Sequence, residues 1–421
     1  MTRQKKERFK SFKSRNLDSE IGQLQASLDA SALKGSKVKQ HLQSFSFQEL
    51  SMKLIEKLSF RDTAKTISRF LHLSEETSLR HTTLEDRIES VGRELSKAYE
   101  SKAEEILEAN QIDKASGIID ESSTIPSAAR NLDLPALQEE SHIRKLITDY
   151  NRGRDSLLKL KFGEQTSNIE ADPNLCCYIR IDDVGVKFQK EKRNGKCLKS
   201  KKYVENTVIH IQMKDEQYSI TAIGMDKAFR LLIAFLLENK LMENRRLIFL
   251  TDGATNIKDR IEKYFAFRDK TVVLDWLHLE KKCHDYMSMA VKGTKKEKEE
   301  LKKTLTAILW TGRTDKAVQY LSNIKSRNIK NNNILEDLKN YILRKSNYIP
   351  CYALRHELGL TISSNRVEKE NDLVVASRQK HNGMAWSDKG SGALAIIKAA
   401  MNNREMDTWI RSKQILFKMT A

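Results

Sequence analysis

The spacing of hydrophobic residues divides the chain into a helical first part and a strand-rich middle part. Between about residues 45 and 160, apolar positions such as Leu50, Leu54 and Leu58 recur every three or four residues, which predicts successive amphipathic helices. From residue 174 the period shortens to two, and the segments LCCYIRIDDVGVKF, KYVENTVIHIQM and QYSITAIGM predict an antiparallel meander of three strands. RLIFLTDGA and KTVVLDWLHL contain continuous apolar runs, as in parallel strands that are buried on both faces.

These elements predict an α/β fold with a mixed sheet of three antiparallel and then two parallel strands. Helices are expected at 226–242 and near 255–265, between the later strands, and the tail ALAIIKAAMNNREMDTWIRSKQILF is also expected to be helical. SSTIPSAARNLDLP holds two of the four prolines and predicts a linker. The expected divisions are a basic tail at 1–16, an all-α region at 17–121, a linker at 122–135, a connecting helix at 136–173, core strands at 174–279, a helical insertion at 280–355, and C-terminal helices at 356–421.

Residues 59–92 match the pattern of a helix-turn-helix. Ser59 is placed to cap a first helix, a break falls at about 72–74, and Ser74 or Thr77 could cap a second helix. Gly92 suits either the end of that helix or a tight helix crossing. A separate helical run is expected at 93–125. The second helix would present three basic residues to DNA, namely Arg80, His81 and Arg87. A plain helical hairpin has the same pattern, so this alternative stays open.

Charge narrows the class of partner. The chain of 421 residues carries 75 Lys and Arg against 57 Asp and Glu, a net charge of +18, which indicates a polyanion and above all nucleic acid. No apolar run approaches the roughly 20 residues of a membrane span, and the basic N-terminus lacks the apolar segment of a secretory signal. The five cysteines lack paired spacing, which favours reduced thiols. We therefore expect a cytoplasmic, nucleoid-associated protein without a membrane partner.

Acidic residues at strand ends are the candidates for chemistry. Asp182 or Asp183 lies in the first strand and Asp252 ends the RLIFL strand, where ligands of open α/β sheets bind. Glu368 lies in the helix after the insertion, and helical spacing predicts that it faces the core while Glu370 faces solvent. Converging carboxylates could hold two Mg²⁺ ions for phosphodiester chemistry. Alternatively, the spacing from Asn365 to Glu368 is that of a helix capping box.

Four motifs in order resemble those of a DDE-type bacterial insertion-sequence transposase of the ISKra-like kind. IDDVGVKFQ resembles the first-Asp block, LTDGA the second-Asp block, LDWLHL the motif of the fifth strand, and SSNRVEKENDLVVASRQKHNGMAWS followed by GALA the Glu helix and its tail. The resemblance covers roughly residues 174–400. Departures are the Asp182-Asp183 pair, where many relatives have Asp-Gly, and a Thr361–Asn365 stretch where a glycine-rich turn is common.

The resemblance implies an RNase H-like catalytic core with a helical insertion before the catalytic Glu helix, and an enzyme that cleaves and transfers DNA strands at the ends of a mobile element. It implies Asp182, Asp252 and Glu368 as catalytic residues and ligands of two Mg²⁺ ions, with Mn²⁺ as a substitute. Asp183, Asp275 and His278 are second-rank or supporting candidates. Double-stranded DNA, from element ends and target, is the implied partner, and a homodimer or larger assembly is expected in the DNA complex.

Further side chains near these motifs are candidates for DNA contact. They are Lys187, Lys190 and Arg193 after the first strand, and Arg366, Arg378, Lys380, His381 and Trp386 around the Glu helix. Trp386 could equally be a core residue, and each cation could be a solvated surface charge. Cys283 and His284, with His278 nearby, could suggest zinc, but the fourth ligand of such a site is missing. Two other functions stay open: a catalytically silent, transposase-derived DNA-binding regulator, and an RNase H-fold nuclease that cuts RNA in hybrids.

Overall fold

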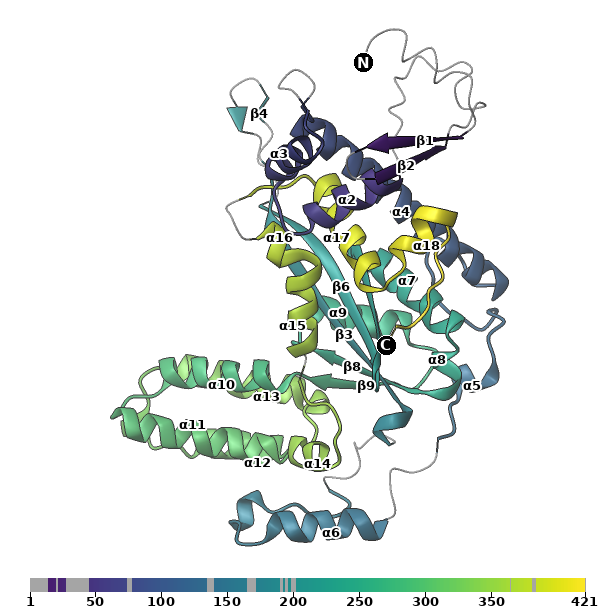
Figure 1. Ribbon diagram of the computed structural model, residues 1–421. Coiled ribbons are helices and arrows are strands. Elements are labelled where there is room, and N and C mark those ends of the chain that lie inside the picture. Colours follow the sequence, from purple (N-terminus) through teal and green to yellow (C-terminus); the bar gives the residue numbers. More distant parts are fainter. Residues whose placement is uncertain are drawn as a thin grey trace.

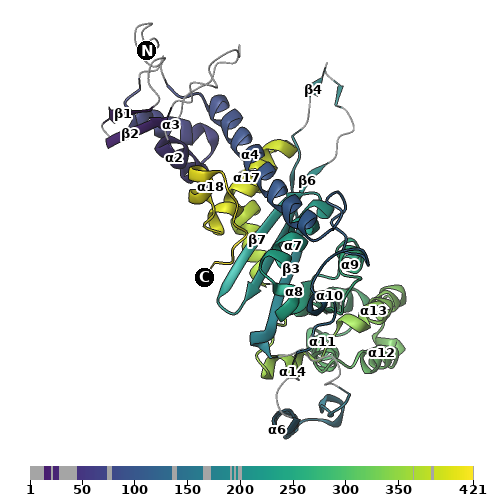
Figure 2. The same ribbon diagram turned by 90° about the vertical axis from the view of Figure 1, so that its right-hand side faces the viewer.

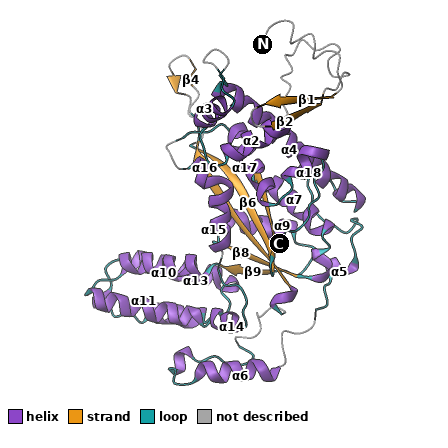
Figure 3. Ribbon diagram, in the orientation of Figure 1, coloured by secondary structure: helices purple, strands orange, loops and turns teal. Residues whose placement is uncertain are grey.

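A computed structural model describes residues 14–19, 22–27, 45–73, 78–134, 140–164, 172–189, 192–193, 196–197, 202–363, 365–380 and 384–420. Helices and strands alternate only in the middle of the chain (Figures 1 and 3). The strands are β1 (Ser14–Ser19), β2 (Gly22–Ser27), β3 (Cys176–Lys187), β4 (Lys192–Arg193), β5 (Lys196–Cys197), β6 (Tyr203–Met213), β7 (Glu216–Ile223), β8 (Arg246–Thr251) and β9 (Thr271–Leu274). The helices before the insertion are α2 (Phe45–Ile55), α3 (Phe60–Phe70), α4 (His81–Ala109), α5 (Ser127–Arg130), α6 (Glu140–Asn151), α7 (Met225–Glu238), α8 (Leu241–Asn244) and α9 (Thr255–Tyr264).

The central sheet has the strand order β7-β6-β3-β8-β9. β3 pairs antiparallel with β6 and parallel with β8, β6 pairs antiparallel with β7, and β8 pairs parallel with β9. The expected pattern of three antiparallel strands followed by two parallel ones is therefore confirmed. β3 is the central strand of the sheet, and it links the antiparallel half to the parallel half.

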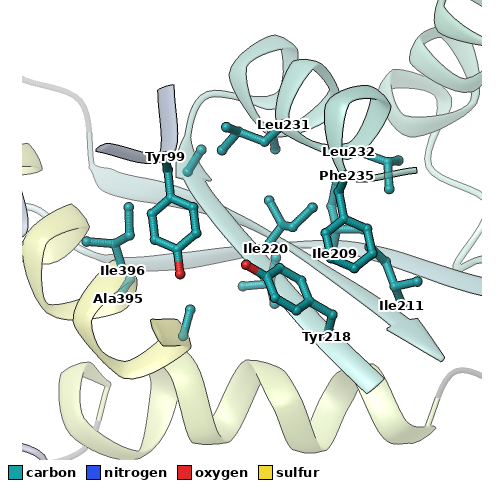
Figure 4. Packing of buried hydrophobic residues seen from close by; sticks show 14 of the residues in the cluster. Tyr99, Ile209, Ile211, Tyr218, Ile220, Leu231, Leu232, Phe235, Ala395 and Ile396 are labelled. Atoms are coloured by element: carbon teal, nitrogen blue, oxygen red, sulfur yellow. The ribbon is translucent and has the colours of Figure 1, made fainter. Parts of the chain in front are cut away.

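Both faces of the sheet are covered. On one face, α7 packs over the antiparallel strands, and Tyr218 of β7 stacks on Phe235 of α7 with ring centroids 4.2 Å apart. Figure 4 shows this core, with Tyr99 of α4 and Ile396 lying beside Ile220. On the other face, the strands contact α15 (Asn365–Asn371), the π-helical turn η7 (Asp372–Ala376) and α17 (Asp388–Asn402). The short helix α16 (Ser377–Gln379) continues from η7, and α18 (Met406–Ser412) contacts α17.

The helical insertion covers the second face over β8 and β9. It comprises α10 (Trp276–Ala290), α11 (Lys295–Trp310), α12 (Thr314–Ser322), α13 (Asn332–Lys345) and α14 (Tyr352–Glu357). Ile248 and Leu250 of β8 belong to its hydrophobic core, whereas their neighbours Leu247 and Phe249 belong to the core around α7. The insertion projects sideways from the sheet, away from α2 and α3 (Figure 1). On the second face it approaches α15, since Nε2 of His278 in α10 lies 4.0 Å from Oε1 of Glu368 in α15; we call this place the seam.

The N-terminal helices differ from the predicted helix-turn-helix in one main respect. Ser59 does cap α3, since its Oγ accepts from the N–H of Asp62 at 3.0 Å. The next helix, however, begins at His81 and continues without interruption to Ala109, so it neither ends at Gly92 nor leaves a separate helix after it. Gly92 instead marks a tight crossing, because a Cβ there would lie 2.3 Å from Cβ of Ala393 in α17. Figure 2 shows α4 running beside α7 and α17, so α4 is part of the main core.

Several boundaries also differ from the sequence-based expectation. Residues 14–27 contain the paired strands β1 and β2, although a helical region was expected from residue 17. The stretch expected to be a linker contains α5, and the expected connecting helix includes α6 at Glu140–Asn151, whereas residues 135–139 lie outside the described residues. The tail is helical only to Ser412, because Lys413 adopts a left-handed conformation and Thr420 pairs with Gln217 at the edge of β7. Among the described residues, no helix is long and apolar enough to span a membrane.

Candidate active site

Strand register brings three aspartates to one edge of the sheet. Arg180 of β3 pairs with Leu250 of β8, and two residues further along both strands are Asp182 and Asp252. Thr251 of β8 pairs with Leu274 of β9, so Asp275 follows at the same edge. Because parallel neighbours in register share a face, Asp182 and Asp252 lie on the same side as Ile248 and Leu250, where the insertion meets α15.

The two adjacent aspartates of β3 point to opposite faces. Asp182 faces α15: its Oδ2 accepts from Nδ2 of Asn371 at 2.6 Å, and its Oδ1 accepts from the N–H of Asp183 at 2.8 Å. Asp183 faces α9 and β6 on the other side, where it accepts from Oγ1 of Thr207 at 2.6 Å and from Nδ2 of Asn256 at 3.3 Å. Of the two, Asp182 is therefore the one that shares its face with the Glu helix.

Asp275 and His278 form a linked pair at the start of α10. Asp275 is 1% exposed and caps the helix, since its Oδ1 accepts from the N–H of His278 at 2.9 Å. The same oxygen lies 3.3 Å from Nδ1 of His278, which orients the imidazole so that Nε2 lies 4.0 Å from Oε1 of Glu368. Asp275 thus acts through the helix cap and the imidazole, and His278 is the member of the pair that faces the site.

The helix carrying Glu368 is rotated relative to the sequence-based expectation. Glu370, expected at the surface, is 7% exposed and accepts from Oγ of Ser219 in β7 at 2.8 Å. Glu368, expected on the packed side, has a side chain that is 58% exposed and faces His278. The prediction failed because it took the packed side from the valines downstream, whereas the π-helical turn η7 breaks the α-helical period between them and Glu368.

Electrostatic interactions link these residues. Burial, together with the negative charge of Asp252, raises the pKa of Asp182 to about 6. The hydrogen bond with Asp275 raises the pKa of His278, and the charges of Asp252 and Glu368 act in the same direction. Asp252 therefore interacts with both Asp182 and His278, and His278 with Glu368, which places the three predicted carboxylates around one seam.

The carboxylate and amide oxygens at the seam are suitable ligands for a hard divalent cation, although they do not form a complete coordination site. Among the described residues, no group of three or more His, Cys, Asp or Glu side chains is arranged to hold a metal ion. Asp182 and Asp252 supply the carboxylate oxygens that Mg²⁺ prefers, and Oδ1 of the buried Asn371 has no hydrogen-bond partner in the described structure. The side chains of Asp182 and Asp252 are therefore of the type that binds Mg²⁺, and Glu368 lies near these two residues.

Three residues of the seam were missed by the sequence analysis. Asn371 lies one helical turn after Glu368, a spacing that could have marked it. Lys345, in the last turn of α13, donates from Nζ to the carbonyl oxygen of Gly253 at 2.6 Å, and burial lowers its pKa. Tyr341, also in α13, has its pKa raised to about 12 by burial. No local signal pointed to Lys345 or Tyr341, because both come from the insertion, about 90 residues after Asp252.

Two residues predicted to contact DNA are instead buried. Trp386 is 5% exposed, and its Nε1 donates to the carbonyl oxygen of Gln379 at 3.1 Å. Arg378 is 3% exposed, lies beside the rings of Phe60 and Trp386, and donates from Nε to the carbonyl oxygen of Ile55 at 3.0 Å. These contacts connect the N-terminal helices to the Glu helix, so both side chains pack in the core of this structure, and a DNA contact for either residue stays a prediction.

The other basic candidates are spread over the surface. Arg80 and His81 at the start of α4 are exposed, Arg87 is half-buried, and Lys187 and Lys380 are exposed. Lys190 and His381 lie outside the described residues, and for Arg193 in β4 and Arg366 in α15 only the backbone is described. A DNA-binding role for these residues stays a prediction.

Comparisons with known proteins add little to this geometry. No family model matches the sequence, and no curated protein matches it. Among solved structures, the chain matches one described as "Drosophila P element transposase strand transfer complex" at 12% identity, covering 66% of this chain and 75% of that one, with a TM-score of 0.22. So poor a superposition carries no argument about fold or activity. The interpretation of the site therefore depends on its own residues.

Proposed function

We propose that this protein is a divalent-cation-dependent DNA transposase of the DDE type, built on an RNase H-like core, that cleaves DNA at the ends of a mobile element and joins the freed strand to target DNA. The observation that carries the proposal is the convergence of Asp182, Asp252 and the helix of Glu368 on one face and one edge of a mixed sheet. The net charge of +18 suits a nucleic-acid substrate.

In this proposal, Asp182, Asp252 and Glu368 hold the cations. Two Mg²⁺ ions bound there would supply activation of the attacking oxygen and stabilisation of the leaving oxygen in phosphodiester cleavage. His278, held by Asp275, keeps its Nε2 toward Glu368 and so orients that carboxylate. The positively charged Nζ of Lys345, in α13, lies at the end of β8, where it could contact a DNA phosphate.

The test compares two matched Asp→Asn changes in a cleavage assay. The substrates are DNA duplexes that carry the sequences flanking the gene, incubated with Mg²⁺. Asp252→Asn is expected to abolish cleavage while duplex binding in a gel-shift assay stays near wild type, because only the cation site is altered. Asp215→Asn, an exposed carboxylate in the turn between β6 and β7, is expected to cleave like the wild type. Equal cleavage by the two variants would refute the proposal.

A second candidate is a DNA-binding regulator without catalytic activity. The exposure of Glu368 and the lack of a finished three-ligand site among the described residues favour it. This candidate predicts sequence-specific binding of flanking DNA and no nicking by the wild type with Mg²⁺ or Mn²⁺. Hybrid substrates in the same assay test the nuclease alternative, since an RNase H-type nuclease would cut the RNA strand of a hybrid in preference to duplex DNA.

A further inference from the structure

Helix α15 is tied to the sheet through two neighbouring residues. Glu370 accepts from Oγ of Ser219 on β7 at 2.8 Å, and Asn371 donates from Nδ2 to Oδ2 of Asp182 on β3 at 2.6 Å. Both tethers are short and both involve buried side chains of the helix, with exposures of 7% and 8%. They differ in that only the second touches a carboxylate of the candidate active site, so the pair offers a natural comparison.

In the described structure, the Asn371 amide makes a hydrogen bond through its nitrogen but none through its oxygen. An ionised carboxylate can only accept hydrogen bonds, so the amide nitrogen is the atom that faces Asp182. The amide oxygen, Oδ1, is buried and has no partner among the described residues. A buried acceptor without a donor destabilises a protein, and such groups are rare unless a water, an ion or a function accounts for them.

Helix geometry places Asn371 beside Glu368 rather than beside Glu370. Residues three apart are about 60° apart around an α-helix, and residues two apart are about 200° apart. Glu368 and Asn371 therefore share the face toward the edge of β3 and β8, whereas Glu370 points across to β7. The π-helical turn starts directly after Asn371, and such turns occur frequently at functional sites.

We propose that Asn371 is a positioning residue of the cation site. Its Nδ2 holds the Asp182 carboxylate in the orientation needed to ligate a divalent cation, and its Oδ1 accepts a hydrogen bond from a water bound to that cation. Mg²⁺ usually keeps several of its waters in protein sites, and ligating carboxylates are commonly held by a second residue. This inference rests on the proposed function, because it requires a divalent cation at Asp182 and Asp252.

The experiment measures Mn²⁺ binding directly, by electron paramagnetic resonance titration of the full chain without DNA. Asn371→Leu keeps the branched shape of the side chain, although it is larger, and removes both donor and acceptor; it is expected to weaken the Kd for Mn²⁺ by about tenfold or more. Ser219→Ala breaks the other tether of the same helix and is expected to bind Mn²⁺ within about twofold of wild type, because it leaves Asp182 untouched. A purely structural tether predicts equal effects of the two substitutions.

The outcomes separate this inference from the proposed function. The cation site stands if the wild type binds Mn²⁺ and Asp252→Asn abolishes this binding. In that case, only the role of Asn371 is overturned if Asn371→Leu leaves Mn²⁺ binding unchanged, or if Ser219→Ala weakens it as much as Asn371→Leu does. If the wild type binds no more Mn²⁺ than Asp252→Asn, the proposed cation site falls, and this inference falls with it.

A folding control accompanies the titration. Leucine beside a buried carboxylate could prevent folding, so each variant is first checked by circular dichroism and thermal melting. Asn371→Ser serves as the second variant, because its shorter hydroxyl cannot reach Asp182 while the position stays polar. A folded Asn371→Ser protein is expected to bind Mn²⁺ more weakly than wild type, and unchanged binding would overturn the inference.

Discussion

The stability of the cation-free protein should fall as pH rises through the pKa of Asp182. Burial raises the pKa of this carboxyl from 3.8 to about 6, so the folded protein favours the neutral form. The stabilisation is complete below the unfolded pKa, and it is lost as pH rises toward and through the folded value. A difference of about two pKa units corresponds to a loss of about 3 kcal/mol in unfolding free energy, of which about 2 kcal/mol falls between about pH 4 and about pH 7.5.

Asp182→Asn isolates this contribution, because asparagine cannot ionise. Its amide can still satisfy the neighbourhood: its oxygen can accept from the N–H of Asp183 and its nitrogen can donate to the unpartnered Oδ1 of Asn371 after that amide turns over. Urea unfolding of wild type and variant is measured with a chelator at about pH 4 and about pH 7.5. The wild type is expected to lose about 2 kcal/mol relative to the variant at the higher pH.

Mg²⁺ provides a second arm of the same assay. At the higher pH, a cation that binds the ionised Asp182 should raise the stability of the wild type and leave Asp182→Asn almost unchanged. Parallel pH profiles of the two proteins without cation would show that Asp182 has an ordinary pKa and would refute the reasoning from burial. Equal stabilisation of both proteins by Mg²⁺ would remove Asp182 from the ligands.

Three further predictions concern the packing that supports the site. Gly92→Leu forces α4 and α17 apart, since even a Cβ would lie 2.3 Å from Ala393, and should lower the unfolding free energy by about 1–3 kcal/mol in urea unfolding; an unchanged urea midpoint would contradict it. Trp386→Ala should lower it by about 3–5 kcal/mol, whereas a purely DNA-stacking tryptophan would change DNA affinity without changing stability. Tyr99→Phe removes one of two tyrosine hydroxyls from the buried Glu405 carboxylate, held at 2.6 Å, and should lower the unfolding free energy by about 1.5–3 kcal/mol in urea unfolding; a variant as stable as the wild type would refute this.

The local pattern of hydrophobic and polar residues predicts much of the fold. Alternation and apolar runs predicted the five strands of the central sheet, three antiparallel and then two parallel, because strand period and burial on both faces are properties of short segments. The same reasoning predicted Asp252 at the end of β8 and the Ser59 cap. Boundaries such as the end of α4 were wrong, since glycine at a helix crossing and glycine at a helix end look alike in a sequence.

The sequence by itself determined which chemistry the chain can offer: carboxylates at strand ends, a strongly basic surface and helices around a mixed sheet. Only the tertiary structure decided which carboxylates meet. Register between β3 and β8 set Asp182 beside Asp252, and the π-helical turn set the rotation that buries Glu370 and turns Glu368 toward His278. Strand pairing and helix rotation depend on contacts between residues far apart in the chain, such as Asn371 with Asp182, and no local period encodes them.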